Sequence, residues 1–406
     1  MKTLIVGSSI AGPTLAWWLS RAGFEVTLIE RAPALRTGGY AVDIRGPALQ
    51  VLEWMGLREA VRPFETDTEK NSAVDGEGKR FAQMPRGFGV LDPGDVEIHR
   101  GDLAKLLCDS MGANVKTVFG ESVRSLEQRA HSVFVEFTGA TPAQEFDLVV
   151  GADGVHSQVR ALAFGPEEQF AKELGSAMAI FSAPNHLGLR REQLLFSNIG
   201  RIASIKSAEK DSLLKMAVFF TVPSGALRGL SVEQQRRLVR EAFADQGFAF
   251  PTLLDAMDVA DDFYCDVTAQ VHLDAFHTGR VALIGDAAAC PSPLSGQGTS
   301  LAIVGAYVLA QQLVAHRDDV ARALKETDAV VMPFARTNQK IALDLARGFA
   351  PKTKLGAWFR NFGMRSMSWM PWSGWMMEQM MKPIRAASRD IVLPQQVIGE
   401  RAITAE

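Results

Sequence analysis

The fold is decided by the first thirty residues, which read KTLIVGSSIAG (2–12), PTLAWWLSRA (13–22) and, after Gly23-Phe24, EVTLIE (25–30). The first segment is an apolar run with branched side chains that ends in a glycine turn. The second has helical spacing, and the third is another apolar run that ends on Glu30. This order predicts a strand, a tight turn, a helix and a second strand with a carboxylate at its tip, which is typical of a dinucleotide-binding βαβ unit.

Each part of this unit has a chemical use. Backbone N–H groups of the turn and the positive end of the helix suit a pyrophosphate. Glu30 follows Gly12 at about the expected spacing of ~20 residues, where it can accept hydrogen bonds from a ribose. Gly7, Ser9 and Gly12 occupy the three fingerprint positions, with Ser9 in place of the middle glycine. Its hydroxyl crowds the phosphate or bonds a phosphate oxygen, a bond worth roughly 1.5–3 kcal/mol. The alternative is an ordinary βαβ turn followed by an exposed Glu.

Composition excludes several other classes. The chain has 406 residues and a net charge of −3, so it has ample material for two or three domains and no basic field to hold nucleic acid. Its three cysteines match no zinc spacing, and we expect no metal site. Sparse cysteines suit a reducing cytoplasm, and no uncharged apolar run reaches the ~18 residues of a spanning helix. We expect a cytoplasmic protein, monomeric or weakly dimeric, without a membrane partner.

Two later strands also end on acids. Phe146–Val150 runs into Gly151-Ala152-Asp153-Gly154 and a helix that carries Arg160, and Gly279–Ile284 runs into Gly285-Asp286. Because ligand groups collect at the carboxyl ends of strands in open α/β sheets, Asp153 and Asp286 are candidates to join Glu30 at one edge.

Three further features suggest contacts with a flat, charged ligand. The apolar helix from Gly298 to Leu313 should be buried, and the turn Gly296-Gln297-Gly298 leaves its positive amino end free for an anionic ring edge. Arg100 opens a helix against the macrodipole, which suggests that another group faces its charge. Arg45 follows a loop with paired glycines that a ring could approach. The alternatives are a core helix started by a loop, and solvated arginines.

The predicted fold class is α/β, with a Rossmann-type domain, an inserted sheet domain and a helical end. We assign residues 1–166 and 267–345 to the nucleotide-binding domain, 167–266 to a mainly antiparallel substrate-binding sheet, and 346–406 to a C-terminal helical segment. Residues 75–78 (DGEG) predict a hairpin turn. The Met- and Trp-rich tail suits packing against the sheets, a substrate cover, a partner surface or an interfacial membrane helix. Candidate pocket residues in the inserted sheet are Phe181, His186, Phe196, Lys215 and Phe220.

These ordered motifs resemble the single-component FAD-dependent aromatic hydroxylases, the class A flavoprotein monooxygenases, over roughly residues 1–340. The segments GGYAVDIRG (38–46) and CPSPLSGQG (290–298), together with the helical C-terminal segment, look most like the tetracycline-inactivating members. The resemblance implies FAD as cofactor, with NADPH or NADH docking transiently because no second dinucleotide unit is visible.

The resemblance also implies residue roles. Gly7, Ser9 and Gly12 would hold the pyrophosphate, Glu30 and the adjacent Arg31 the adenosine side, and Arg45 and Arg100 would lie along the FAD. Asp153 and Arg160 belong to a motif tied to FAD and NADPH, and Asp286 would accept from the ribityl chain. Pro293, Gly296, Gln297 and Gly298 would face the flavin. Cys290 and Ser300 stand where a His and an Asn are common in the family.

The implied reaction is hydroxylation of a bulky aromatic or polyketide substrate, with tetracycline as one candidate, by a flavin C4a-hydroperoxide formed from NAD(P)H-reduced FAD and O₂. The flavin carries the chemistry, so we expect no catalytic side chain. A halogenase is disfavoured because its W-x-W-x-I-P motif is absent. Two alternatives stay open, a reductase or dehydrogenase of the same superfamily without oxygen insertion, and a non-catalytic flavin-binding sensor.

Overall fold

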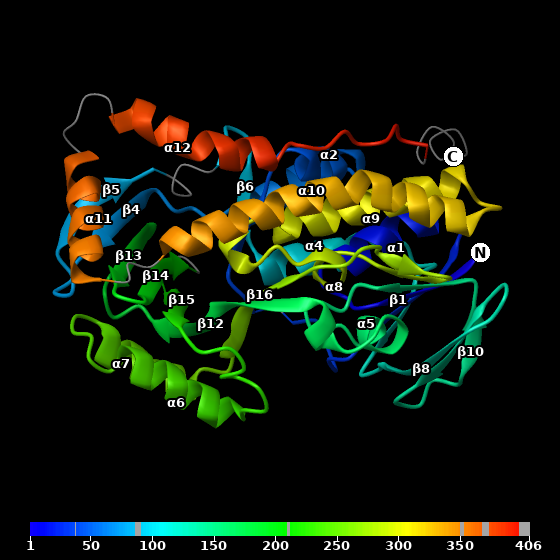
Figure 1. The fold of residues 1–406 in the computed structure, drawn as a ribbon, viewed down its shortest axis with the longest axis horizontal. Coiled ribbons are helices and arrows are strands. Elements are labelled where there is room, and N and C mark those ends of the chain that lie inside the picture. The colour runs from blue at the N-terminus through cyan, green and yellow to red at the C-terminus, as the bar shows by residue number, and fades with distance from the viewer. Residues whose placement is uncertain (37, 86–90, 209–211, 350–352, 368–372, 398–406) are drawn as a thin grey trace.

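The computed structural model describes residues 1–36, 38–85, 91–208, 212–349, 353–367 and 373–397. A nucleotide-binding unit forms one end of the elongated molecule, and a large antiparallel sheet forms the other (Figure 1). The long helices α9 (Gly298–Ala315) and α10 (Val320–Phe349) run along the molecule between the two ends.

The nucleotide-binding unit is built on a six-stranded sheet in the order β17-β18-β11-β1-β2-β7. All its neighbours are parallel except the β17–β18 pair. Its strands are β1 (Lys2–Val6), β2 (Glu25–Glu30), β7 (Lys116–Phe119), β11 (Leu148–Gly151), β17 (His277–Thr278) and β18 (Val281–Leu283). The predicted βαβ unit is present, with α1 (Ala11–Arg21) between β1 and β2. β1 and β11 are buried at almost every position, as expected for strands that are covered on both faces.

Helices and two small sheets complete this unit. The helices are α2 (Pro47–Trp54), α3 (Arg58–Val61), α4 (Arg100–Ser110), α5 (Gln158–Ala163), α8 (Asp286–Ala289) and α9 (Gly298–Ala315), with 3-10 turns η1 (Arg62–Phe64), η3 (Glu167–Gln169) and η4 (Pro293–Ser295). A ribbon pairs β3 (Ala41–Ile44) with β6 (Val96–His99), and a meander joins β8 (Val123–Gln128), β9 (Val133–Phe137) and β10 (Gln144–Phe146).

α9 is buried along most of its length. Among the described residues it is the one helix long and apolar enough to cross a membrane, but 78% of it is buried inside the protein. It contacts α1, α2 and α10, as a core helix does.

The second sheet has seven strands in the order β16-β12-β15-β14-β13-β4-β5. They are β4 (Lys70–Val74), β5 (Arg80–Met84), β12 (Ala171–Pro184), β13 (Glu192–Asn198), β14 (Arg201–Ala208), β15 (Leu213–Thr221) and β16 (Tyr264–Val271). The predicted hairpin at residues 75–78 joins β4 to β5. This hairpin lies outside the 167–266 segment, yet β4 pairs in parallel with β13. The sheet is therefore assembled from two distant parts of the chain. The first part, β4 and β5, was not included in the predicted sheet segment.

One face of this sheet is covered by α6 (Val232–Phe243) and α7 (Phe250–Val259), seen below the sheet in Figure 1. α6 begins with a capping box in which the Ser231 side chain accepts from the Gln234 N–H and the Gln234 side chain accepts from the Ser231 N–H. Phe243 stacks on Phe250 at a centroid distance of 5.2 Å and lies edge-on to Phe220 at 6.2 Å. These rings hold the helices on the sheet.

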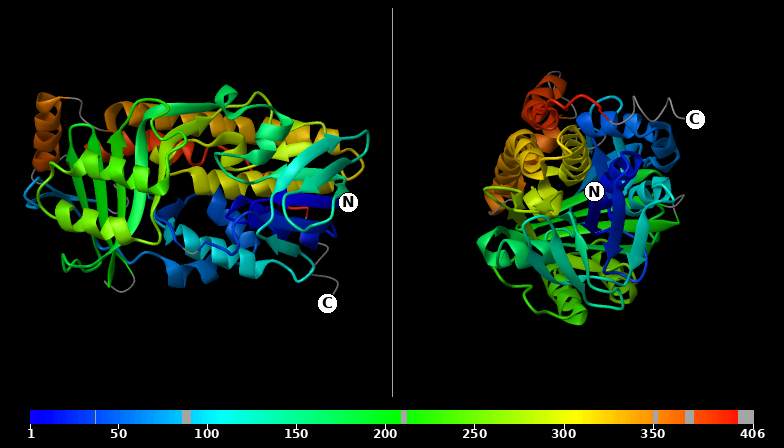
Figure 2. Two further views of the ribbon diagram at one scale, coloured as in Figure 1. Left: turned by 90° about the horizontal axis from the view of Figure 1, so that it is seen from below. Right: turned by 90° about the vertical axis from the view of Figure 1, so that its right-hand side faces the viewer.

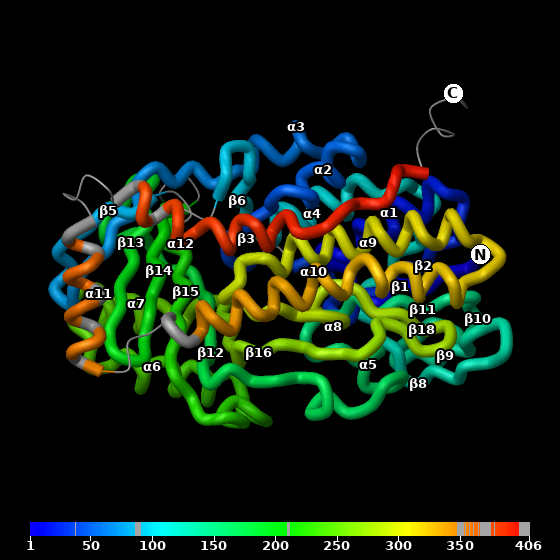
Figure 3. Tube along the Cα trace, turned by 45° about the horizontal axis from the view of Figure 1, so that its top comes forward, coloured from blue at the N-terminus to red at the C-terminus, as the bar shows by residue number. Residues whose placement is uncertain are grey.

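The C-terminal segment is helical, with α11 (Lys354–Met367) and α12 (Ser373–Ala387) after α10 (Val320–Phe349). α11 stands beside β5 at the far end of the sheet, and α12 turns back along α10 (Figures 2 and 3). The chain after α12 is held by the Tyr307 hydroxyl, which donates to the Pro394 carbonyl at 2.8 Å. α12 packs on α10 rather than against a sheet as predicted, and it buries Ile384 and Ala387. Large apolar side chains of both tail helices are exposed, namely Leu355, Trp358, Phe359, Phe362, Trp375 and Met380. The tail residues Trp369, Met370 and Trp372 lie outside the described part.

The aromatic stack can be tested by truncation. Phe243→Ala should lower the free energy of unfolding by about 3–5 kcal/mol, because it opens a cavity at a fully buried position between helix and sheet. Urea unfolding followed by circular dichroism measures the change. Val232→Ala on the exposed side of the same helix should alter it by less than about 0.5 kcal/mol. Equal effects of both substitutions would contradict the packing role.

Candidate functional site

The carboxyl ends of four neighbouring strands, β18, β11, β1 and β2, meet at one edge of the six-stranded sheet. Glu30 ends β2, and its two carboxylate oxygens accept the N–H groups of Ser8 and Ala32, each at 2.9 Å. The acid is therefore fixed against the turn after β1. Each of its oxygens keeps a lone pair for a further donor such as a ribose hydroxyl.

Two glycines of the turn are required by close contacts. A Cβ atom on Gly12 would lie 1.9 Å from the carbonyl oxygen of Gly7, and one on Gly7 would lie 2.4 Å from that of Ala152. Gly7 also has a φ of +110°, which side chains rarely adopt. These contacts let the amino end of α1 reach the strand tips, as the fingerprint requires for phosphate approach.

Arg100 lies at the same turn. Its guanidinium donates to the Ser9 hydroxyl at 2.9 Å, and its backbone N–H donates to the Tyr40 carbonyl at 3.0 Å. Burial raises the pKa of Tyr40 to about 12, and the charge of Arg100 opposes that shift. The predicted positive group at the start of α4 therefore faces the pyrophosphate turn, which explains why an arginine is tolerated there.

Asp286 lies at the start of α8. Its side chain is open to solvent, but protein surrounds it closely enough that desolvation raises the pKa of its carboxyl, again opposed by Arg100. The neighbouring Cys290 is a buried thiol whose Sγ lies 3.5 Å from the Ala269 carbonyl, and burial raises its pKa well above the usual range. Asp286 therefore remains available to a ligand, whereas the thiol is unsuited to act as a nucleophile.

Asp153 and Arg160 mainly build the turn around them. Asp153 accepts from the Ser157 hydroxyl at 2.5 Å and from the Val159 N–H at 3.1 Å, at the amino end of α5. Arg160 is fully buried, and its guanidinium donates to the carbonyls of Ala287 at 3.0 Å and Val155 at 2.6 Å. The arginine thus ties the turn after β11 to α8, and its buried Nε has no hydrogen-bond partner within the described part of the chain.

The turn before α9 is unusual in its backbone and in its unpaired polar groups. Ser292 has a φ of +82°, a strained value for a residue with a side chain. Gln297 is buried, and within the described part of the chain its side-chain amide has no hydrogen-bond partner. The same holds for the Nε and Nη1 atoms of the buried Arg45. Such groups are costly unless a ligand or water completes them.

The β3–β6 ribbon lies beside this turn. Arg45 follows β3, its backbone N–H donates to the Ser300 hydroxyl at 3.2 Å, and its guanidinium is paired with Asp43. A Cβ on Gly296 would lie 3.0 Å from Nη2 of Arg45. On the ribbon, Asp43 lies opposite Glu97. The carboxylate of Glu97 contacts Lys206 of the large sheet.

Polar side chains cross the face of the large sheet that lies opposite α6 and α7. Registered partners on successive strands are Ser182, Lys215, Lys206, Gln193 and Asn71, in that order. Residues directly opposite each other point to the same face. We call these five residues the polar row.

The two lysines of the polar row are each balanced by an acid. Nζ of Lys206 donates to Glu97 at 2.5 Å, and Nζ of Lys215 donates to Ser182 at 2.7 Å and Asp262 at 3.3 Å. Lys206 is only 5% exposed. Like charges on directly opposite residues are unfavourable, so this arrangement depends on both acids.

His99 lies close to the lysines at the end of β6. Burial, followed by the charge of Lys206, lowers the pKa of His99. Its Nδ1 and the Oδ1 of Asn71 are buried without a hydrogen-bond partner among the described residues. The polar row and His99 therefore combine two acid-paired lysines with two buried atoms that lack a hydrogen-bond partner in the described chain, which is a suitable lining for a polar ligand.

The sheet corrects part of the predicted pocket. Phe181, Phe196 and Phe220 are at most 3% exposed and belong to the core between the sheet and helices α6 and α7, because alternate residues of a strand point to opposite faces. His186 is exposed in the connection from β12 to β13. Lys215 alone of these five lies in the polar row.

The sequence interpretation missed His99, Asn71, Gln193 and Lys206. The sequence offered no clear signal for Lys206, because its strand also carries Arg201, Ser204 and Ser207. The strand register that joins Asn71, Gln193 and Lys206, and the approach of His99 from β6, could not be seen in the sequence. Of the other predicted cofactor residues, Arg31 is exposed after β2, and Pro293 opens η4.

A second ionic network links the turn after β11 to the edge of the large sheet. His156 lies between Glu167 at 2.9 Å and Asp266 at 3.0 Å, and the Tyr264 hydroxyl donates to Asp266 at 2.7 Å. The hydrogen bond to Asp266 is the main cause that raises the pKa of His156 to about 9. The imidazolium therefore holds the two parts of the protein together at neutral pH.

These features fit FAD. The glycine turn with Glu30 and Arg100 suits an adenosine pyrophosphate, Asp286 suits a polyol, and the amino end of α9 with its unpaired Gln297 suits the flavin edge. Among the described residues no group of three or more His, Cys, Asp or Glu could hold a metal ion.

Comparisons with known proteins agree with this geometry. Residues 1–327 match the family described as "FAD binding domain". An uncharacterized protein of Mycobacterium tuberculosis is 42% identical, over 86% of this chain and 95% of its own length. A flavin-dependent monooxygenase of Legionella longbeachae is 35% identical, over 87% of this chain and 91% of its own. The crystal structure of tetracycline destructase Tet(51) superposes with a TM-score of 0.85 at 32% identity, covering 97% and 99% of the two chains.

The close approach of Gly12 and Gly7 predicts a binding defect. Gly12→Ala should weaken FAD binding by about 10- to 100-fold, because the added methyl must displace the turn at a cost of ~1–3 kcal/mol. Titration of the apoprotein with FAD, followed by flavin fluorescence, measures the change. Gly76→Ala, which places a methyl in open space with an ordinary φ, should bind like the parent chain. Unchanged binding by Gly12→Ala would refute the assigned contact.

The His156 network predicts a pH-dependent stability. The pKa of His156 is raised in the folded protein above its unfolded value of about 6.5, so its contribution is complete below pH ~6.5 and is lost as the pH rises through about 9. The Tm difference between the parent chain and His156→Gln should therefore be largest near pH 6 and vanish near pH 10. His131→Gln, at an exposed position, serves as the control. A Tm difference that does not change with pH would show that the imidazolium is not what stabilises the network.

Proposed function

Because the chain belongs to the FAD-dependent monooxygenases of the FAD-binding-domain family, we propose that it hydroxylates a bulky, polyoxygenated aromatic or polyketide substrate that carries an anionic oxygen. We further propose NADPH or NADH as the transient electron donor. Small molecule, O₂ and reduced nucleotide would be its only partners in turnover, in the cytoplasm.

The polar row is the observation that supports this substrate class. Lys206 and Lys215 stand opposite each other on adjacent strands, and Gln193 and Asn71 continue the row. A small apolar ring would leave the buried Oδ1 of Asn71 and Nδ1 of the nearby His99 without partners, at a cost of ~1–3 kcal/mol each. A molecule with several ring oxygens, one of them ionised as an enolate or phenolate, would satisfy them and ease the lysine repulsion.

The ribbon links this row to the cofactor site. Lys206 pairs with Glu97, Glu97 lies opposite Asp43, and Asp43 pairs with Arg45 beside the turn before α9. Substrate held on the polar row would therefore lie on the side of the sheet that faces the flavin turn. This placement supports a substrate site between the sheet and the cofactor.

Bound FAD supplies the electron transfer from NAD(P)H to O₂ and the delivery of one oxygen atom to the substrate. The chain positions the reactants. Gly7, Gly12 and Glu30 hold the dinucleotide, the amino end of α9 favours negative charge at the flavin edge, and Lys206 orients the substrate. His99, with a lowered pKa, is suited to accept a proton from a substrate hydroxyl at neutral pH.

Tetracycline is one candidate within this class. The similarity to Tet(51) extends along nearly the whole of both chains, and tetracyclines carry the ionisable, oxygen-rich edge that the polar row suits. We therefore propose tetracycline inactivation, with antibiotic resistance as its outcome, as the first specific activity to test.

Turnover with aromatic polyketides tests the proposal. Lys206→Met should raise the KM for an anionic substrate about 10- to 100-fold with a smaller change in kcat, because a charge-assisted hydrogen bond of ~1.5–3 kcal/mol is lost. Substrate-dependent NADPH oxidation and a product mass increased by one oxygen are the measurements. Lys70→Met removes an exposed lysine of the same sheet and should leave KM unchanged.

The same assay separates the alternatives. NADPH oxidation without oxygen in the product would favour a reductase or dehydrogenase. FAD binding without NADPH oxidation by any substrate tested would favour a non-catalytic sensor. Retention of the flavin spectrum in Lys206→Met shows that a KM effect is not due to unfolding.

A further inference from the structure

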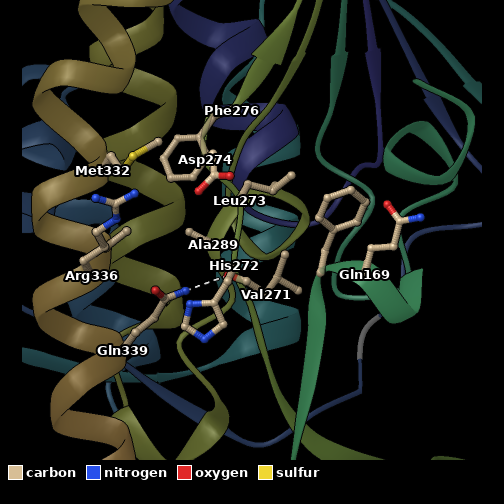
Figure 4. Close-up of a pocket in the computed structure, with 12 residues that line it drawn as sticks. Gln169, Val271, His272, Leu273, Asp274, Phe276, Ala289, Met332, Arg336 and Gln339 are labelled. Carbon is tan, nitrogen blue, oxygen red and sulfur yellow. Dashed lines mark hydrogen bonds between the residues drawn. The ribbon is translucent and has the colours of Figure 1, made fainter. Parts of the chain in front are cut away.

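A second cavity lies away from the cofactor turn, between α10, the segment that follows β16, and η3. Its volume is about 360 Å³, near the lower limit of ~300–1,000 Å³ for small-molecule sites. Figure 4 shows Met332, Arg336 and Gln339 projecting from α10 towards Leu273, Asp274 and Phe276 on the opposite wall. Phe170 closes the side formed by η3.

The cavity is separated from the predicted flavin turn by a rigid wall. Ala289 lines the cavity, and the next residue, Cys290, begins the segment that leads to that turn. Two buried glutamines brace this wall, because Gln270 donates to the Pro291 carbonyl at 3.1 Å and Gln339 donates to the Val271 carbonyl at 2.6 Å. The carbonyls of Pro291 and Val271 are thus each bonded by a buried glutamine side chain.

One cation at the rim of the cavity lacks a partner among the described residues. Arg336 is exposed at its rim and forms no hydrogen bond or ion pair with the described part of the chain. His272 lies opposite, and burial together with the charges of Lys172 and Arg336 lowers its pKa. Asp274 is the one acid among the lining residues, so the lining has no net charge, and the unpaired guanidinium of Arg336 is the group that an anion would contact.

Part of the remaining lining is aromatic or apolar. Phe170, Phe276 and Met332 contribute two aromatic rings and a thioether, which pack well against a planar ring. A guanidinium at the rim matches a carboxylate or phosphate in a bidentate manner.

We infer that this cavity is a second ligand site, which binds a one- or two-ring aromatic compound with its anionic group on Arg336. The volume excludes a whole dinucleotide but admits a bicyclic carboxylate, or the terminal phosphate-bearing part of a nucleotide. Because the ligand would rest on the Ala289–Pro291 wall, its binding should be sensed by the segment that leads to the flavin turn.

The test uses the full chain loaded with FAD and two probes, 2-naphthoate and 2′,5′-ADP. Isothermal titration should show saturable binding of at least one probe, and Arg336→Gln should weaken it by tenfold or more. Lys340→Gln removes an exposed cation four residues along the same helix that does not line the cavity, and it should bind like the parent. The stronger probe identifies the source of the anion as a carboxylate or a nucleotide phosphate.

Binding at the polar row is distinguished by a third variant. Lys206→Met should leave the binding of the probe unchanged if the ligand occupies the second cavity. Loss of binding in Lys206→Met with retention in Arg336→Gln would assign the probe to the polar row and overturn the inference. The absence of saturable binding of both probes, or equal binding by Arg336→Gln and the parent chain, would also overturn it. None of these outcomes depends on turnover, so the proposed reaction can fail independently.

Discussion

The cofactor site depends on the close approach between the backbone of Gly12 and the carbonyl oxygen of Gly7. There is no room for a single additional carbon atom at Gly12, and this brings the first turn of α1 against the strand tips. Glu30, Ser9 and Arg100 are then placed around the same turn by short hydrogen bonds. The charged groups for a dinucleotide therefore depend on a steric condition met by two residues without side chains.

The second organising feature is the division of the large sheet into two unlike faces. One face buries aromatic rings against α6 and α7, and the other carries the polar row. Because successive side chains of a strand alternate between faces, one sequence serves both purposes. A one-residue slip of β14 would move Lys206 into the aromatic core and expose Ile205 to the opposite side. Packing of the helices thus also sets the register of the polar row, which we propose contacts the substrate.

The sequence predicted the nucleotide-binding unit well, because its signals are local. A strand, a turn, a helix and an acid follow one another within thirty residues, and the strand-end acids Asp153 and Asp286 repeat the pattern. The buried α9 and the arginine at the start of α4 could also be read directly. The strand order of the large sheet could not be predicted, since β4 and β13 are more than a hundred residues apart and nothing in either strand specifies its partner. Aromatic residues such as Phe196 were assigned to a pocket because composition does not reveal which face of a strand is buried. The bonds of Arg160 to backbone carbonyls could not be predicted either, because one of them depends on a contact with α8 far along the chain.

The parallel pairing of β4 with β13 has a consequence for how the protein can be built and rearranged. A fragment limited to residues 167–266 would carry β13 as an open edge, with the main-chain groups that normally bond β4 left free to join other chains. During synthesis the early hairpin must also wait for more than a hundred further residues before it has a strand to join, a long-range closure that slows folding. Grafting this sheet onto a related protein would therefore require the hairpin to be exchanged together with it.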